Sequence, residues 1–212
     1  MTRPRHDRAL LHLVAREDAD LGHALTNAAA RVGLTLLTRD PACFMGTTSP
    51  QAAAIEAVPG AFSSLAEVTA TLADLLDHDR SMAIVGTDHV FIEPQPTPVR
   101  YQYLMHRRPD FTHEQYLERY RTVHSEFGLR TANISGYVQL HVDLDASAEL
   151  GRATGLHATP CDSMSELYLE SVPHFIEGVI AQPEVGAEAQ EDEERFVARD
   201  ISLGFAHRLV AL

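Results

Sequence analysis

Hydrophobic residues recur at strand and helix spacing in the second half of the chain. β-branched and aromatic residues over 99–105 predict a strand. Thr112, with Gln115 three residues later, has the spacing of a capping box and predicts the start of a helix. The later elements predicted in this half are a strand at 137–143, a loop, a strand at 163–169, a helix at 173–180 and a strand at 201–209. The predicted order is therefore βαββαβ.

The first half repeats this order with very little residue identity. An aspartate, Asp18 or Asp20, precedes apolar residues at helical spacing, and Ser64 with Glu67 forms a second capping box. The elements predicted in this half are a strand at 10–14, a helix, strands at 34–38 and 54–58, a helix and a strand at 82–92. Alternating prolines over 94–98 favour an extended connector. The sequence thus predicts an α+β protein built as a tandem of ferredoxin-like halves, which are residues 1–97 and 98–212.

The strand predicted at 137–143 has one polar and one apolar face. Tyr137, Gln139 and His141 alternate with valine and leucine, and side chains alternate between the two faces of a strand. A βαββαβ unit packs both helices on one face of its sheet and leaves the other face open. We therefore expect the apolar face to meet the helices and the polar face to line a cleft between two sheets. A solvent-exposed polar face is the alternative.

Composition and charge narrow the class of protein. The chain has 212 residues, 45% apolar and 22% charged, as is usual for soluble globular proteins. It has no signal-peptide pattern and no run of about 18 apolar residues, so no membrane partner is expected. Its two cysteines, Cys43 and Cys161, argue against a disulfide framework and indicate a cytoplasmic protein. The formal net charge of −13 argues against a nucleic-acid partner. Six acids within 184–194 are interpreted as a solvated surface segment.

Four segments of the second half resemble the EthD family, in the family's order. The first runs from a strand through a basic-proline turn into a capped helix with aromatic residues and a histidine near its end. The four segments are 103–124, 134–141, 165–175 and 191–200. The resemblance implies a dimeric α/β barrel, in which two ferredoxin-like sheets meet. The first half lacks these motifs and is interpreted as a diverged copy that supplies the partner sheet. The chain would then be an intrachain pseudo-dimer, with a homodimer as the alternative.

The methylmuconolactone isomerases, which are close in motif within the wider superfamily, imply three catalytic residues. Their helix histidine, second-strand tyrosine and loop histidine match His124, Tyr137 and His157 of this chain. Their third-strand cysteine corresponds to Leu167, and this departure leaves the isomerase reaction itself open.

The predicted strands of the second half add three further candidates. His141 and Gln139 share the strand face of Tyr137, and Tyr103 lies on the first strand of this half. We expect His124 and His141 to act as acid and base, because imidazole exchanges protons near neutral pH. Tyr137 would polarise a substrate oxygen, while Tyr103 and Gln139 would bind the substrate. Packing in the core is the alternative role for these side chains.

No motif in the chain predicts a cofactor. Zinc-binding spacings, a P-loop, a dinucleotide fingerprint and a nucleophile elbow are all missing from the sequence. Cofactor-free chemistry is expected, with haem on a cavity histidine as the alternative. The predicted function is a cofactor-independent isomerase, cyclase or dehydratase, that is an isomerase or lyase. Its substrate would be a small oxygenated molecule of aromatic, lactone or polyketide-like structure. A cofactor-free monooxygenase and a non-catalytic binding protein are the alternatives.

Overall fold

Eight antiparallel strands of one chain close into a barrel. The computed structural model describes residues 3–17, 19–32, 34–39, 52–57 and 62–210. Within these residues the strand order around the barrel is β1-β3-β2-β8-β5-β7-β6-β4, and β4 closes the ring by pairing with β1. Each half contributes four neighbouring strands, so the predicted pairing of two ferredoxin-like sheets takes place within the chain.

The first half supplies four strands and two helices. Its elements in chain order are β1 (Arg3–Val14), α1 (Leu21–Val32), β2 (Thr35–Arg39), β3 (Ala52–Ala57), α2 (Phe62–Leu72), a 3₁₀ turn (Ala73–Leu75) and β4 (Met82–Ile92).

The second half supplies four strands and a larger set of helices. Its elements in chain order are β5 (Val99–Met105), α3 (His113–Arg119), a π-helical segment (Tyr120–His124), α4 (Ser125–Arg130), β6 (Gly136–Val142), α5 (Leu144–Thr154), β7 (Ser163–Leu169), α6 (Val172–Ala181), α7 (Pro183–Phe196) and β8 (Leu203–Val210).

All eight strands predicted from the pattern are confirmed, and the capping signals are confirmed in part. The Thr112 side chain accepts a hydrogen bond from the backbone of Gln115, and the Gln115 side chain accepts one from the backbone of Thr112. Asp20 accepts a hydrogen bond from the backbone of Gly22, at the start of α1. Ser64 was predicted as a cap, but α2 already begins at Phe62, so Ser64 lies inside the helix.

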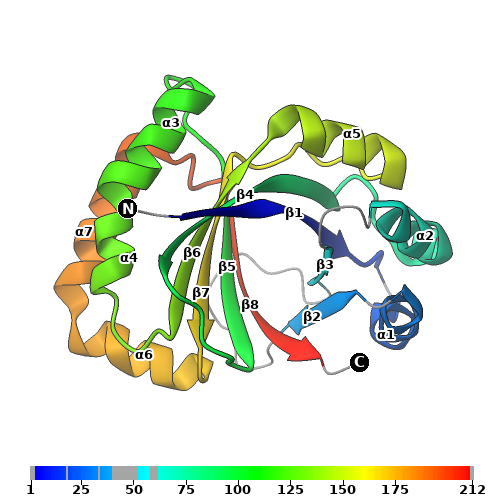
Figure 1. The fold of residues 1–212 in the computed structure, drawn as a ribbon, viewed down its shortest axis with the longest axis horizontal. Helices are drawn as coiled ribbons and strands as arrows, with labels where there is room; N and C mark the ends of the chain where they lie inside the picture. The colour runs from blue at the N-terminus through cyan, green and yellow to red at the C-terminus, as the bar shows by residue number, and fades with distance from the viewer. Residues whose placement is uncertain (1–2, 18, 33, 40–51, 58–61, 211–212) are drawn as a thin grey trace.

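Two helices were not predicted. The segment after β6, predicted as a loop, forms α5, because Asp143 caps its N-terminus and Gly155 ends it with a left-handed conformation of φ 67°. The acidic segment, predicted as a solvated surface stretch, forms α7. Figure 1 shows α3, α4, α6 and α7 on one side of the barrel and α1, α2 and α5 on the other.

The direction of the two faces of β6 was predicted wrongly. Leu140 and Val142 pack inside the barrel with Leu10 and Ile84 of the first half. Tyr137 faces outward and packs among residues covered by the helices. The prediction assumed that the face between the sheets is the polar one, but the middle of the barrel is an apolar core. An apolar face therefore has to point inward here.

One end of the barrel interior holds a cluster of buried charges from both halves. Arg8 of β1 donates to Glu166 of β7 at 2.9 Å, and Arg100 of β5 donates to Glu56 of β3 at 2.7 Å. A third carboxylate, Asp88 of β4, lies 3.2 Å from Arg8. These ion pairs cross the seam between the two sheets and fix one half against the other.

One of the two cysteines lies in the described part of the barrel. Cys161 is buried in the barrel and carries a free thiol. Cys43 lies outside the described residues. Over the described ranges, no helix has the length and hydropathy required to cross a bilayer.

Candidate functional site

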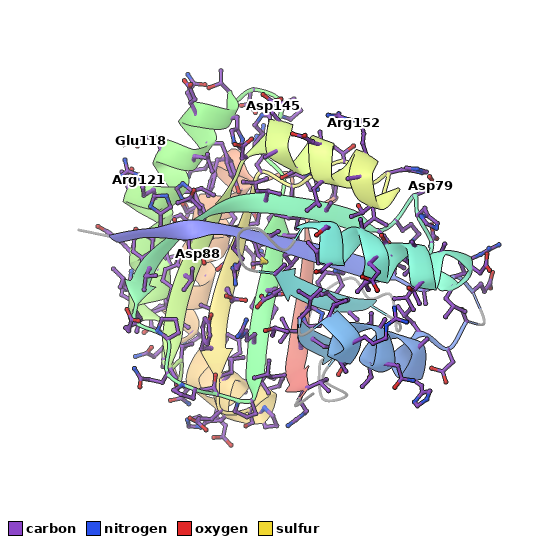
Figure 2. The ribbon with its side chains drawn as sticks, turned by 45° about the vertical axis from the view of Figure 1, so that its right-hand side comes forward. Asp79, Asp88, Glu118, Arg121, Asp145 and Arg152 are labelled. Atoms are coloured by element: carbon purple, nitrogen blue, oxygen red, sulfur yellow. The ribbon has the colours of Figure 1, made fainter. Side chains whose placement is uncertain are left out.

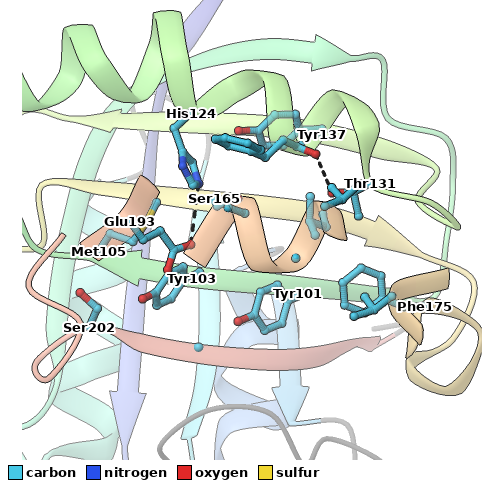
Figure 3. A pocket seen from close by; sticks show the side chains of 18 of the residues that line it. Tyr101, Tyr103, Met105, His124, Thr131, Tyr137, Ser165, Phe175, Glu193 and Ser202 are labelled. Atoms are coloured by element: carbon cyan, nitrogen blue, oxygen red, sulfur yellow. Dashed lines mark hydrogen bonds and ion pairs between the residues drawn. The ribbon is translucent and has the colours of Figure 1, made fainter. Parts of the chain in front are cut away.

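A cavity of about 830 Å³ lies between the outer face of the second-half sheet and the helices that cover it. Strands β5, β6, β7 and β8 form its floor, and the π-helical segment with α4, α6 and α7 forms its roof (Figure 3). Its walls are largely apolar and aromatic, with Met105, Phe127, Leu167 and Phe175 among them. All described lining residues belong to the second half. The expected cleft between the two sheets, covered by the first half, is therefore corrected to a cavity within the second half.

His124 lies at the end of the π-helical segment and lines this cavity. Its Nδ1 lies 3.1 Å from Oδ2 of Asp192, and its Nε2 lies 3.7 Å from Oε1 of Glu193 (Figure 3 draws the Glu193 contact). A carboxylate only accepts hydrogen bonds, so Nδ1 carries the proton in the neutral ring. The lone pair of Nε2 then points toward Glu193 in the cavity.

The two acids beside His124 have opposite pKa shifts. Burial by itself would raise the pKa of Asp192, but hydrogen bonds from His124 and Arg119 outweigh it, so this pKa lies below its ordinary value. Burial raises the pKa of Glu193 above its ordinary value. Asp192 therefore stays a carboxylate and orients His124. Glu193 holds a proton more readily than an ordinary glutamate does.

A line of polar side chains leads along β6 to the cavity. His141 Nε2 lies 3.2 Å from Gln139 Oε1, and Gln139 Nε2 donates to the Tyr137 hydroxyl at 2.7 Å. Gln139 also donates to the backbone oxygen of Tyr120. Tyr137 reaches the cavity, whereas Gln139 and His141 lie behind it. The three side chains predicted to share a face do share it, and that face is covered by helices.

Tyr103 lines the cavity at the end where α7 leads into β8. Burial raises the pKa of Tyr103 to about 12, and its hydroxyl is hydrogen-bonded with Arg199 and Ser202. Arg199 also lies 3.5 Å from Oε2 of Glu193. The hydroxyl of Tyr103 is therefore coupled to the Glu193 carboxyl through one guanidinium.

The structure does not bring every predicted site residue to the cavity. His124, Tyr137 and Tyr103 line it, and Gln139 supports Tyr137. His157 lies outside it, on the surface, where its Nδ1 is 3.0 Å from Asp79. The ring of His141 lies tilted against that of His89 with centroids 4.0 Å apart, and burial lowers the pKa of His141 to about 3. His141 is therefore a neutral imidazole at pH 7 and lies behind Gln139, outside the cavity lining.

Sequence reasoning missed Asp192 and Glu193. Both lie on the acidic stretch that was interpreted as solvated surface. Within this stretch Val185, Ala189 and Phe196 recur at helical spacing, and this periodicity could have identified a helix with one face turned inward.

The cavity offers one histidine that could meet a haem iron. An axial histidine needs a ring nitrogen that is open to the iron. In His124, the only histidine among the described lining residues, Asp192 occupies Nδ1, while Nε2 faces the cavity 3.7 Å from Glu193. No group of three or more metal-binding side chains occurs among the described residues. Nε2 of His124 is thus the ring nitrogen open to a ligand in the cavity, and it can exchange a proton there.

Comparison with known proteins agrees with this architecture. No curated protein matches the chain. A structure named an anthrone oxidase-like protein is 12% identical, with a TM-score of 0.57, over 97% of this chain and 92% of that one. A structure named as a candidate chlorite dismutase is 10% identical, with a TM-score of 0.56, over 97% of this chain and 94% of that one. A haem-binding protein from Thermus thermophilus is 14% identical, with a TM-score of 0.51, over 100% of this chain and 94% of that one.

At these identities the structural likeness shows the fold alone. The family is shown by a family model, described as the EthD domain, that matches residues 108–200. This range contains His124, Tyr137, Asp192 and Glu193. The second half of this chain thus contains an EthD domain over residues 108–200, carried on a single-chain barrel of two ferredoxin-like halves.

Proposed function

We propose that the protein is an enzyme that transfers a proton on a small, largely apolar, oxygenated molecule bound in the second-half cavity. The observation that supports this most is the arrangement of His124 between Asp192 and Glu193 at an aromatic cavity wall. A base held in one tautomer by a carboxylate, with its other nitrogen facing the ligand space, is the arrangement that proton abstraction requires.

His124 is the base in this proposal. Asp192 accepts the Nδ1 proton and stabilises the imidazolium that forms when Nε2 removes a proton from the substrate. Arg119 also donates to Asp192 and keeps this carboxylate in place. Glu193, whose pKa is raised by burial, returns or accepts the proton on the cavity side.

Tyr137 is the group that stabilises negative charge on the substrate. Its hydroxyl accepts the hydrogen bond from Gln139, so its own proton remains available to a substrate oxygen. A substrate carbonyl bound there would become an enolate as His124 removes the neighbouring proton, and a hydrogen bond to the developing oxyanion lowers the barrier.

A cofactor-free oxygenase is the second candidate, favoured by the names of similar structures. Those names include an anthrone oxidase-like protein and a candidate monooxygenase from Lactobacillus acidophilus NCFM, which is 12% identical over 98% of this chain with a TM-score of 0.51. Its first step, removal of a proton from the substrate by His124, is the same as in the first candidate. The carbanion left by proton removal would bond to dioxygen, the O–O bond would break, and a ketone and one water would form from the methylene group and O₂.

Anthrone and an unsaturated five-membered lactone are suitable probes, because each contains a C–H that conjugation with its carbonyl makes acidic. Exchange of this hydrogen for deuterium, followed by NMR under nitrogen, measures proton transfer directly. We expect the protein to accelerate exchange of at least one probe. His124→Gln should slow it by about 10²–10⁴-fold, the usual contribution of a general base.

His174→Gln is the matched control, because His174 is an exposed helical histidine beside Glu177 and lies outside the cavity. This variant should exchange the probe at the wild-type rate. If His124→Gln exchanges the probe at the wild-type rate, the assignment of His124 as the base is refuted. Repeating the reaction in air with an oxygen electrode separates the two candidates, since only an oxygenase consumes O₂ in proportion to product.

A further inference from the structure

A second cavity, of about 460 Å³, opens at one end of the barrel. Its walls come from both halves, with β1 and β4 on one side and β8 on the other. It shares no described lining residue with the cavity that contains His124. Asp79 marks this end of the barrel, and Asp88 of the charge cluster lies well away from it in Figure 2.

His12 is the most deeply buried of the polar side chains that line this cavity, the others being Asp79, Arg80, His106 and Thr159. Its side chain belongs to β1, is only 2% exposed and packs on Phe205 with ring centroids 4.5 Å apart. Among the described residues neither of its ring nitrogens has a hydrogen-bond partner. Burial and the nearby Arg80 lower its pKa to about 4, so the ring is neutral at pH 7. It then offers one donor and one acceptor to a ligand.

Arg80 supplies a positive charge at the rim. Its side chain is 60% exposed, and its contact with Asp77 is long, at 3.9 Å. The neighbouring carboxylates have other partners: Asp79 is paired with His157 at 3.0 Å, and Asp77 accepts from the backbone of Arg80 at 3.2 Å. Over the described part of the chain the guanidinium of Arg80 makes no side-chain hydrogen bond. Its donors are therefore available to an anion.

The walls between these two groups are apolar. Met82, Leu203 and Phe205 separate the rim from the buried imidazole. A ligand that fits must therefore combine a flat apolar body, a negative group for the rim and a polar edge that can reach His12. A polar edge that reaches His12 would give its imidazole a hydrogen-bond partner.

We propose that this cavity is a second ligand site, which binds a small aromatic carboxylic acid with its ring against Phe205 and His12 and its carboxylate on Arg80. The site is independent of the proton-transfer cavity and of the function proposed for it. It uses residues of the first half, which contribute nothing described to the other cavity.

The test uses the full chain with ¹³C-labelled histidine and two probes, 2-naphthoate and its neutral analogue 2-naphthamide. The ring signal of His12 is identified as the signal that disappears in His12→Gln. Should that variant fail to fold, the signal is identified by its shift in Phe205→Leu, because Phe205 touches the ring. Titration of 2-naphthoate should move this signal saturably. The naphthoate should bind about fivefold or more tightly than the amide, as expected for a partly exposed ion pair.

Arg80→Gln and Arg31→Gln form the matched pair of variants. Both arginines are similarly exposed, at 60% and 59%, and each lies near a carboxylate, at 3.9 Å from Asp77 for Arg80 and at 3.2 Å from Glu67 for Arg31. The preference for the acid over the amide should vanish in Arg80→Gln and persist in Arg31→Gln. The proposal is overturned if naphthoate leaves the His12 signal unmoved, if the amide binds as tightly as the acid, or if Arg80→Gln keeps the preference.

Discussion

Two neighbouring carboxyl groups of α7, Asp192 and Glu193, have opposite electrostatic environments. Asp192 is met by His124 and Arg119 and has a lowered pKa, whereas Glu193 is buried at the cavity and has a raised pKa. Adjacent helical residues point in directions about 100° apart, so one carboxyl can reach the helix beside it while the next faces the cavity. This difference separates an orienting residue from a proton-carrying one.

Asp192 is predicted to act on the reaction through His124. In Asp192→Asn the amide can donate to Nδ1, which would favour the ring tautomer with its proton on the cavity side. The exchange rate of a bound probe should fall by about 10²-fold, while the KM for the probe stays within about twofold. Steady-state deuterium exchange at several probe concentrations gives both values.

Asp110→Asn is the control for this prediction, because Asp110 is an exposed carboxylate paired with Arg108. It should leave both constants unchanged. A rise in KM at unchanged kcat in Asp192→Asn would instead assign Asp192 to substrate binding.

Individual side chains were only partly predictable. His124 and Tyr137 were identified by resemblance to a known motif, and both line the cavity. His157 matched less securely, and the loop that carries it runs toward Asp79 on the surface. A loop position has no periodicity, so its direction depends on contacts that the local sequence does not record.

At the scale of elements, the shape of the cavity depends on how closely the helices approach the sheet. Gly128 of α4 lies directly against the ring of Tyr137, and a Cβ atom at this position would come within 2.5 Å of Tyr137 Cζ. Phe91 stacks on Tyr137 with ring centroids 5.2 Å apart, so the ring has no free space to move into. Glycine is required here for the approach of helix and strand.

Gly128→Ala is predicted to destabilise the protein although alanine favours helices. The collision with Tyr137 should cost about 1–3 kcal/mol, against a gain of about 1 kcal/mol from helix propensity. The free energy of unfolding, measured with urea, should therefore fall, and proton-transfer activity should fall with it because Tyr137 moves.

Gly186→Ala is the matched comparison, since no heavy atom lies within 4 Å of a Cβ at this position of α7. This substitution should raise the free energy of unfolding by about 0.5–1 kcal/mol. Equal stability changes in the two variants would contradict the proposed contact.

The strands were predicted well and the helices less completely. Alternating or continuous apolar runs identified every strand, because each strand of the closed barrel buries at least part of its length. Helix α7 was missed because its composition is dominated by acids, although Val185 and Phe196 are buried on one side of it. The π-helical segment at Tyr120–His124 was not predicted, since one extra residue in a turn leaves no clear mark on hydrophobic periodicity.

For the molecule as a whole, the buried charge cluster makes the pairing of the two halves sensitive to pH. It contains three carboxylates, Glu56, Asp88 and Glu166, against two guanidinium groups, Arg8 and Arg100. Burial raises the pKa of Asp88 from 3.8 to about 6, despite the charge of Arg8 beside it. The folded protein therefore holds a proton on Asp88 in a range where the unfolded chain has released it.

Asp88→Asn should reveal this linkage. Because the folded pKa lies above the unfolded one, the contribution of Asp88 to stability is complete below about pH 3.8 and is lost as the pH rises to about 6. Relative to Asp88→Asn, the wild type should lose about 3 kcal/mol across this window and nothing further above it. Urea midpoints at pH 4, 5, 6 and 7 measure the difference.

Asp74→Asn, at an exposed aspartate of the first half, is the control and should track the wild type at every pH. A difference between wild type and Asp88→Asn that stays constant from pH 4 to pH 7 would contradict the raised pKa.

The amino-acid sequence by itself determined the strands, the repeated βαββαβ order, the capped helix at Thr112 and the EthD-like second half. These features follow from local periodicity, capping chemistry and short motifs. Only the tertiary structure decided which face of β6 turns inward and which side of the sheet holds the cavity. It also placed Asp192 and Glu193 beside His124. These outcomes depend on the sheet of the first half and on α7, which meet β6 and the first helix of the second half from distant parts of the chain.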